Sequence, residues 1–152
     1  MPIHCDIVSQ DRMVYSGDAD MIIVPGVEGE MGILPNHAPL LSTLNLGILR
    51  VRHQGKELEF TIAGGVVEVQ PDSVTVLADA AENVSEIDVA RAEAARKRAE
   101  EMLAQGVGKD TDTYLRLENA LRRSKLRLDA VRRYGQAGRY AQPGSASSKK
   151  ES

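Results

Sequence analysis

The chain has 152 residues, 42% of them hydrophobic, with no Trp and a single Phe. This length suits one large domain or two small ones with an aliphatic core, and no stretch approaches the roughly 18 apolar residues of a membrane-spanning helix. The net charge of −3 hides an asymmetry, because residues 1–84 carry four Lys/Arg against twelve Asp/Glu, whereas residues 85–152 carry fifteen against ten. The split indicates two parts that face different partners, although two ordinary solvated surfaces would also produce it.

The N-terminal residues have the features of neither a signal peptide nor a transit peptide, so we expect the protein to stay in a reducing compartment. Cys5 is the only cysteine, which excludes a disulfide framework within the chain. It lies in an alternating apolar pattern, and we expect it to be a small buried hydrophobe rather than a reactive thiol.

The first half of the chain alternates apolar and polar residues in short runs that turn signals separate, such as Gln54-Gly55 and Pro71-Asp72. Such runs predict half-buried strands. We expect them near residues 3–7, 12–16, 18–24, 47–53, 56–63, 66–70 and 73–79. Many short strands at this spacing favour a β-sandwich or a flattened barrel.

Residues 25–47 contain four glycines and three prolines, which exclude a regular helix. Pro35 and Pro39 lack backbone donors and favour edge or loop positions, so Asn36 and His37 between them are predicted to lie on a fairly rigid loop. The Gly64-Gly65 pair predicts a bulge or a tight turn.

No catalytic set is recognisable, and we predict that the protein is not an enzyme and has no metal site. His4, His37 and His53 lack the spacing of zinc ligands. The glycines of the segment 26–32 lack the strand–glycine–helix context of a nucleotide fingerprint, and there is no G-x-S-x-G element. A β-sandwich hydrolase is therefore a weak alternative.

Residues 85–134 have the pattern of two amphipathic helices. Ser85 and Asp88 match a capping box at the start of the first helix, and Gly106 to Gly108 would end it. Small residues recur along one side of this helix, which would let another helix approach closely. They are Ala92, Ala95 and Ala99, followed by Met102.

The second helix would begin with Asp110 or Thr111 as its cap and stop at Gly135. Its larger apolar residues fall on one side, with Ser124 between them: Tyr114, Leu117, Leu121, Leu128 and Val131. These residues facing the alanine strip predict an antiparallel hairpin, and simple packing is enough to explain the pattern.

A basic segment at the end of the second helix goes beyond what packing requires. Between residues 122 and 133 it has one acid, Asp129, and six basic residues: Arg122, Arg123, Lys125, Arg127, Arg132 and Arg133. Such a face could dock on an acidic protein surface or bind nucleic acid. Because stacking aromatic residues are scarce and the rest of the chain is acidic, we predict a protein partner and no nucleic acid.

Two segments make the sequence similar to a known family. PGVEGEMGILPNHAPLLSTLNLGILR at residues 25–50 and IAGGVVEVQPDSVTVLADAAE at residues 62–82 closely resemble the epsilon subunit of bacterial rotary F-type ATP synthases. The resemblance covers about residues 1–134, and its most specific part is the loop from Gly32 to Leu40. It implies a β-sandwich of about ten strands over residues 1–84 and an antiparallel α-helical hairpin over residues 85–135. We expect residues 136–152, which are small, polar and aperiodic, to be a disordered tail.

The same resemblance implies a non-catalytic rotor subunit in the central stalk, which couples the c ring to the gamma subunit. Glu30, Gly32 and His37 match the positions that face the c ring. The helices would extend along gamma to the beta and alpha subunits, where the basic face would block ATP hydrolysis. The implied location is the cytoplasmic side of the bacterial cell membrane, with the membrane reached only through the c ring.

Residues 87–92, Ile-Asp-Val-Ala-Arg-Ala, match the family's ATP-binding pattern of Ile/Leu-Asp-x-x-Arg-Ala. The resemblance therefore implies a regulatory ATP site, with no required cofactor, that comprises Glu82, Ile87, Asp88, Arg91, Ala92, Arg123 and Arg127. Without a phosphate-binding loop or a catalytic base, ATP would be a ligand and not a substrate. Asp88 as a simple helix cap and Arg91 as a simple ion-pair partner remain open, as does a free-standing cytosolic ATP-binding sensor or adaptor.

Overall fold

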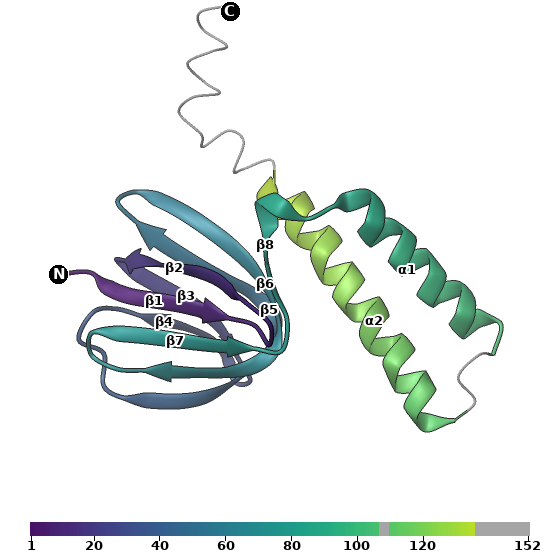
Figure 1. Ribbon diagram of the computed structural model, residues 1–152, viewed down its shortest axis with the longest axis horizontal. Coiled ribbons are helices and arrows are strands. Elements are labelled where there is room, and N and C mark those ends of the chain that lie inside the picture. The colour runs from purple at the N-terminus through teal and green to yellow at the C-terminus, as the bar shows by residue number, and fades with distance from the viewer. Residues whose placement is uncertain (107–109, 136–152) are drawn as a thin grey trace, which may run out of the picture.

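A curved β-sheet and a helical hairpin make up the two parts of the chain (Figure 1). The computed structural model describes residues 1–106 and 110–135. The expected disorder of residues 136–152 therefore lies outside the described residues. The hairpin lies at one end of the sheet, with its second helix nearer to the strands than its first.

Eight strands form the sheet within the described residues. They are β1 (Ile3–Val8), β2 (Met13–Ala19), β3 (Met21–Gly26), β4 (Gly29–Ile33), β5 (Leu40–His53), β6 (Lys56–Val69), β7 (Ser73–Ala78) and β8 (Ala81–Asn83). Their order is β2-β1-β7-β6-β5-β3-β4, with β8 also paired to β6. All pairs are antiparallel except β1 with β7. The sheet curls around its own core, which makes the predicted sandwich.

The described residues form eight strands where the resemblance implies about ten, and two of the eight are longer than the sequence pattern indicates. β5 and β6 have 14 residues each: β5 begins at Leu40, before Gly47, and β6 continues through the Gly64-Gly65 pair that was expected to interrupt it. Gly64 and Gly65 lie inside β6 with φ values of 89° and 127°, a left-handed conformation that glycine adopts readily. A Cβ at Gly65 would collide with the backbone of β7.

The segment 25–47 contains more sheet than its glycines and prolines predict. Pro25 and Gly26 end β3, pair with Glu30 and Gly29, and so form a tight hairpin with β4. Asn36 and His37 do lie on the loop between β4 and β5, as expected. The backbone N–H of Asn36 donates to the carbonyl of Pro71 at 2.8 Å, which fixes the loop against the β6–β7 turn.

The core consists of the inward-facing residues of the strands and is almost wholly aliphatic. Alternation along β1 buries Ile3, Cys5 and Ile7 completely. The single Phe, Phe60, is also fully buried, and its ring centroid lies 5.3 Å from that of Tyr15. Burial raises the pKa of the Cys5 thiol to about 12. The thiol is thus protonated and inaccessible, which confirms its expected role as a small hydrophobe.

The hairpin consists of α1 (Val89–Ala104) and α2 (Thr111–Ala130), with the short turn η1 (Val84–Glu86) before it and η2 (Val131–Gly135) after it. Asp88 caps α1 and Asp110 caps α2. The predicted capping box of Ser85 with Asp88 is wrong, because Ser85 lies in η1 and donates to the side chain of Asn83. The carboxylate of Asp88 instead accepts the N–H of Arg91 at 3.1 Å.

The two helices pack through the small residues that the sequence indicates. Ala92 and Ala99 of α1 and Ser124 and Ala130 of α2 are all buried. The Ser124 hydroxyl donates to the carbonyl of Ala120 at 2.9 Å, so this polar group is satisfied within its own helix. Tyr114, in the first turn of α2, is 46% exposed and does not belong to the packed side.

Candidate functional site

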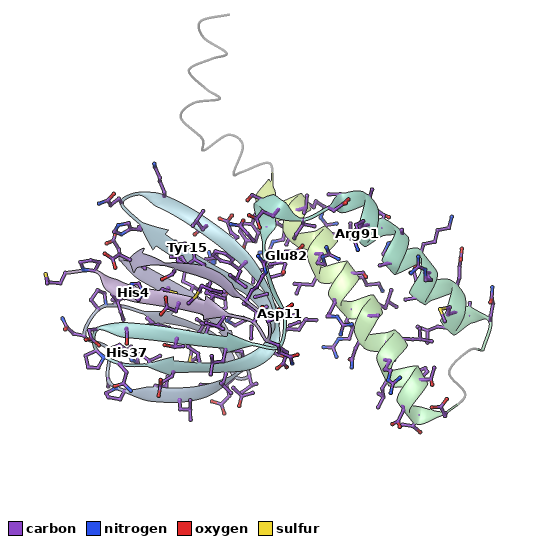
Figure 2. All side chains as sticks on the ribbon, viewed as in Figure 1. His4, Asp11, Tyr15, His37, Glu82 and Arg91 are labelled. Carbon is purple, nitrogen blue, oxygen red and sulfur yellow. The ribbon has the colours of Figure 1, made fainter. Side chains whose placement is uncertain are left out.

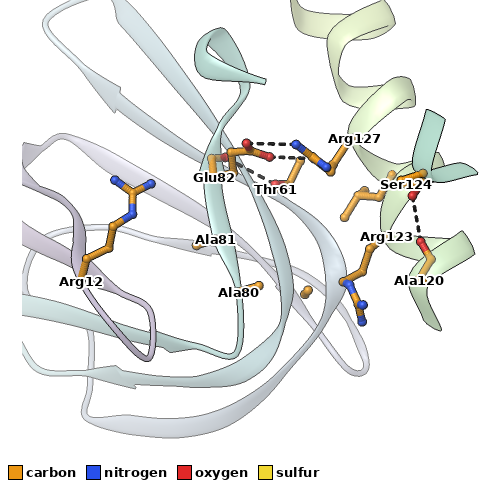
Figure 3. Close-up of a pocket in the computed structure, with 12 residues that line it drawn as sticks. Arg12, Thr61, Ala80, Ala81, Glu82, Ala120, Arg123, Ser124 and Arg127 are labelled. Carbon is orange, nitrogen blue, oxygen red and sulfur yellow. Dashed lines mark hydrogen bonds and ion pairs between the residues drawn. The ribbon is translucent and has the colours of Figure 1, made fainter. Parts of the chain in front are cut away.

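A pocket of about 400 Å³ lies where α2 meets the sandwich (Figure 3). Thr61 of β6 and Glu82 of β8 line it from the sandwich, and Ala120, Arg123 and Arg127 line it from α2. One wall is thus a strand edge and the other a helix face. Any molecule in this pocket would contact both parts of the chain.

The Glu82–Arg127 ion pair joins the two walls. Arg127 donates from Nε to Oε1 of Glu82 at 2.8 Å and from Nη2 to Oε2 at 3.2 Å. Both side chains are only 28% exposed. Two parallel hydrogen bonds between a planar guanidinium and a carboxylate fix orientation as well as distance. The pair therefore fastens α2 to β8, and we refer to it as the clasp.

Two further guanidinium groups line the pocket, from Arg123 on α2 and from Arg12 in the turn between β1 and β2. Within residues 1–106 and 110–135, neither makes an ion pair within 4.0 Å. The pocket thus holds one paired cation, two unpaired ones and one carboxylate. This balance favours an anionic occupant.

The seven residues of the implied ATP site fall into two groups. Glu82, Arg123 and Arg127 line the pocket together. The other four lie at the start of α1 and do not line it: Ile87, Asp88, Arg91 and Ala92.

The local structure accounts for the second group. The carboxylate of Asp88 is engaged as the cap of α1, and Ala92 is buried in the hairpin. Arg91 is exposed and makes no ion pair with a described residue (Figure 2). The assignment of all seven residues to one ATP site stays a prediction.

Arg12 is the pocket residue that the sequence analysis does not single out. It opens the strand expected near residues 12–16 and has no motif around it. Its position beside the pocket depends on the fold, because β2 passes close to β8 although about 60 residues separate them in sequence. No pattern along the chain signals this proximity.

The residues predicted to face the c ring lie away from the pocket. His37 is at the loop end of the sandwich, opposite the hairpin (Figure 2), and its Nδ1 lies 2.7 Å from the carbonyl oxygen of Ala38. Glu30 and Gly32 are on β4 rather than in the loop. Glu30 lies 3.4 Å from Nη2 of Arg50, and a Cβ on Gly32 would meet the side chain of Met21 at 2.6 Å.

The predicted basic face is not uniformly available. Arg122, Arg123 and Lys125 are exposed on α2. Arg127 is engaged in the clasp, and Arg132 pairs with Asp129. The guanidinium carbon of Arg133 lies 5.2 Å from the centre of the Tyr134 ring. Contacts within the chain therefore already engage three of the six basic residues.

An apolar row crosses the outer face of the sheet over β2, β1, β7 and β6. Strand register aligns Met13 with Val8, Val8 with Leu77, and Leu77 with Val66. Met13 and Leu77 are 53% and 51% exposed. Outward-facing apolar residues at one register of four adjacent strands are typical of a surface that another protein covers.

No helix in residues 1–106 and 110–135 has the length and apolar character to cross a membrane. The same residues contain no group of three or more His, Cys, Asp or Glu side chains arranged to hold a metal ion.

Comparison with known proteins gives the family. A family model described as ATP synthase, Delta/Epsilon chain, beta-sandwich domain matches residues 2–84, and one described as ATP synthase, Delta/Epsilon chain, long alpha-helix domain matches residues 85–132. The ATP synthase epsilon chain of Halalkalibacterium halodurans is 46% identical over 131 residues, which cover 86% of this chain and 98% of that one. That of Pelotomaculum thermopropionicum is 55% identical over 100 residues, covering 66% and 75%.

A solved structure agrees with this result. A chain in the OSCP/F1/c-ring structure of the Euglena gracilis mitochondrial ATP synthase has a TM-score of 0.69 and 28% identity to this chain, over 86% of this chain and 81% of that one. The chain therefore belongs to the ATP synthase epsilon chain family, and it is a non-catalytic subunit of that complex.

Proposed function

We propose that the subunit works in the central stalk, where it couples the c ring to the gamma subunit and restrains ATP hydrolysis through a movable hairpin. The observation that carries the proposal is the contact between the hairpin and the sandwich, which one clasp fastens over an open pocket. Membership of the family supports the place in the complex. The c ring would then be the subunit's only link to the membrane.

The two surfaces of the sandwich suit two different neighbours. The apolar row from Met13 to Val66 offers a band for burial against another folded subunit, and we assign it to gamma. The loop end with His37 lies opposite the hairpin and exposes Leu34 and Leu41 as well as His37, and we assign it to the loops of the c ring. The gamma subunit and the c ring would then both bind the sandwich, and neither would prevent the hairpin from moving.

The contact between α2 and the sandwich is loose enough for the hairpin to leave. Besides the pocket of about 400 Å³, a second pocket of about 330 Å³ opens between Asp79 of the sandwich and Arg122 of α2. Interiors of proteins pack far more densely than this. The buried core cluster consists entirely of residues 3–78, so the hairpin contributes no residue to it.

The hairpin would have a compact state on the sandwich and an extended state along gamma. In the extended state the basic residues of α2 would reach acidic surfaces of the beta and alpha subunits and stop rotation in the hydrolytic direction. ATP in the pocket would favour the compact state by its greater affinity for that state, and thereby relieve the restraint.

Removal of residues 85–152 tests the proposal. The sandwich retains its whole core cluster, the apolar row and the His37 loop, so it should still assemble with the other subunits. ATP hydrolysis by the reconstituted synthase should rise severalfold relative to the full-length subunit. Hydrolysis that is unchanged in a complex of normal subunit composition would rule out the restraint.

A further inference from the structure

The apolar row on the outer face of the sheet adjoins a second row that is polar and acidic. Strand register places four outward-facing residues side by side in this acidic row: Ser16, Asp6, Thr75 and Glu68. On β1, Asp6 lies two positions before Val8, so the two rows are about 7 Å apart on the same face. A protein that covers the apolar row would therefore also meet the acidic row.

A histidine lies between two carboxylates next to the acidic row. Nε2 of His4 lies 3.0 Å from Oδ1 of Asp6, and its Nδ1 lies 3.4 Å from Oδ1 of Asp18. The hydroxyl of Ser16 donates to the same oxygen of Asp6 at 2.6 Å. On the other side, β7 places Ser73, which does not titrate, opposite His4. A protonated imidazole can donate to both carboxylates at once, whereas a neutral imidazole can donate to only one.

This histidine cluster is open to solvent. The side chains of His4, Asp6 and Asp18 are 45%, 30% and 55% exposed. The backbone N–H of His4 donates to the carbonyl of Asp72 at 3.0 Å, which ties the start of β1 to the β6–β7 turn. Figure 2 shows His4 on the side of the sandwich away from the hairpin, as it does His37. The cluster therefore lies between the apolar row and the loop end.

We propose that a proton on His4 and a basic side chain of the subunit that covers the apolar row compete for Asp6 and Asp18. The inference rests on the contact with gamma proposed above, and it adds the charge of the partner and a proton dependence. Residues 1–84 carry twelve Asp/Glu and four Lys/Arg, so a Lys or Arg of the partner complements this part of the chain. Burial of the apolar row brings the partner within reach of both carboxylates.

The competition has a definite direction. The hydrogen bond with Asp18, followed by the hydrogen bond with and the charge of Asp6, raises the pKa of His4 above its ordinary value against the opposing effect of burial. A partner cation beside the same carboxylates would repel the charged imidazole and favour loss of its proton. Association therefore releases protons near neutral pH, and it weakens as the pH falls and His4 becomes charged.

The affinity of the full-length subunit for the reconstituted assembly of alpha, beta and gamma subunits, measured at pH 6 and pH 8, tests the competition. The unchanged subunit should bind severalfold more tightly at pH 8. His4→Gln keeps a hydrogen-bonding side chain that cannot be protonated, and it should bind tightly at both pH values. His53→Gln is the matched control, because Nδ1 of His53 also lies 3.4 Å from a carboxylate, that of Asp20, and this variant should keep the full pH dependence. Affinity of the unchanged subunit that does not vary with pH, or equal pH dependence in the two variants, would overturn the proposal.

Calorimetry in two buffers of different ionisation enthalpy counts the protons that binding releases. At pH 7 the unchanged subunit and His53→Gln should release a fraction of a proton on binding, and His4→Gln should release less. Asp6→Asn removes one of the carboxylates for which the two cations compete, so it should both weaken binding at pH 8 and reduce the release. Equal release by His4→Gln and His53→Gln would show that the proton does not come from the cluster.

Leu77→Ser separates this inference from the proposed contact with gamma. Leu77 is 51% exposed in the apolar row, and its replacement should weaken binding at both pH values. If Leu77→Ser weakens binding and His4→Gln leaves the pH dependence unchanged, the contact stands and the inference about His4 falls. If Leu77→Ser binds as tightly as the unchanged subunit, the apolar row is not the contact, and both fall.

Discussion

Two carboxyl groups on β6 share a proton on the outer face of the sheet. Burial first, and then the hydrogen bond and charge of Glu57, raise the pKa of Glu59 to about 8. Burial alone would also raise the pKa of Glu57, but its hydrogen bonds with Glu59 and Arg52 leave it below its ordinary value. Glu59 is thus protonated at neutral pH and Glu57 is ionised.

This pair predicts a pH dependence of stability with a definite sign. Between pH 4.5 and about 8 the unfolded chain loses a proton from Glu59 that the folded chain keeps, so stability falls as pH rises through that window. Glu59→Gln should remove on the order of 1 kcal/mol of this fall, a figure discounted because the group is partly exposed. Urea unfolding of the isolated protein at pH 5 and pH 8 measures it.

Glu68→Gln on the same strand is the matched control, because Glu68 is exposed on β6 and lies outside the pair. Its unfolding free energy should change between pH 5 and pH 8 as that of the unchanged protein does. An identical pH slope in Glu59→Gln would contradict the shared proton.

Single residues differ in how far the sequence predicts their roles. Asp110 is recognisable as a cap because a cap needs only its neighbours in sequence, and the buried Cys5 follows from strand alternation. Arg12 and the clasp between Glu82 and Arg127 depend on contacts between distant segments. The family pattern places Glu82 and Arg127 in one site, but it does not indicate that they would bond to each other.

At the level of elements, the start of α2 is fixed by its cap. The carboxylate of Asp110 accepts both the N–H and the hydroxyl of Thr113, at 3.1 and 3.0 Å. These bonds satisfy one of the backbone donors that every helix start leaves open, and they lower the pKa of Asp110. The sequence leaves Asp110 and Thr111 as alternative caps, and the structure selects Asp110.

Asp110→Ala should therefore destabilise the hairpin by removing the cap of α2, whereas Thr111→Ala should have little effect. Amide exchange at the N–H of Thr113 and in the first turns of α2 measures this directly, since the hairpin lies outside the main core. Faster exchange in Thr111→Ala than in Asp110→Ala would contradict the assignment of Asp110 as the cap of α2.

The strands show where a sequence pattern stops being informative. Alternation locates β1 and β7 well because one face of each is buried. The hairpin of β3 with β4 is missed because Pro25, Gly26 and Gly29 have the composition of a loop. Glycine and proline indicate which backbone conformations a segment can adopt. Whether such a segment joins the sheet depends on its pairing with a neighbouring strand.

At the scale of the whole molecule, the chain is a sandwich with its own core that carries a helical hairpin at one end. The sandwich has its own core, and we propose that two of its outward surfaces contact neighbouring subunits. The hairpin is fastened by the clasp and bordered by two open pockets. The proposed two-state restraint requires that this contact can be broken at modest cost.

The clasp should set the balance between the compact and extended states. A partly buried, bidentate ion pair contributes about 1.5 kcal/mol, which corresponds to roughly a tenfold shift in that balance. Glu82→Gln removes the charge from the sandwich wall and leaves every basic residue of α2 intact. Glu86→Gln is the matched control, because Glu86 is exposed a few residues away and does not line the pocket.

The most direct measurement is the rate of ATP hydrolysis by the synthase reconstituted with the unchanged subunit, with Glu82→Gln and with Glu86→Gln. If the clasp holds the permissive compact state, Glu82→Gln should lower hydrolysis severalfold, and Glu86→Gln should leave it unchanged. Removal of residues 85–152 from the Glu82→Gln subunit should abolish its effect. Hydrolysis that is equal or faster with Glu82→Gln than with the unchanged subunit would contradict the account.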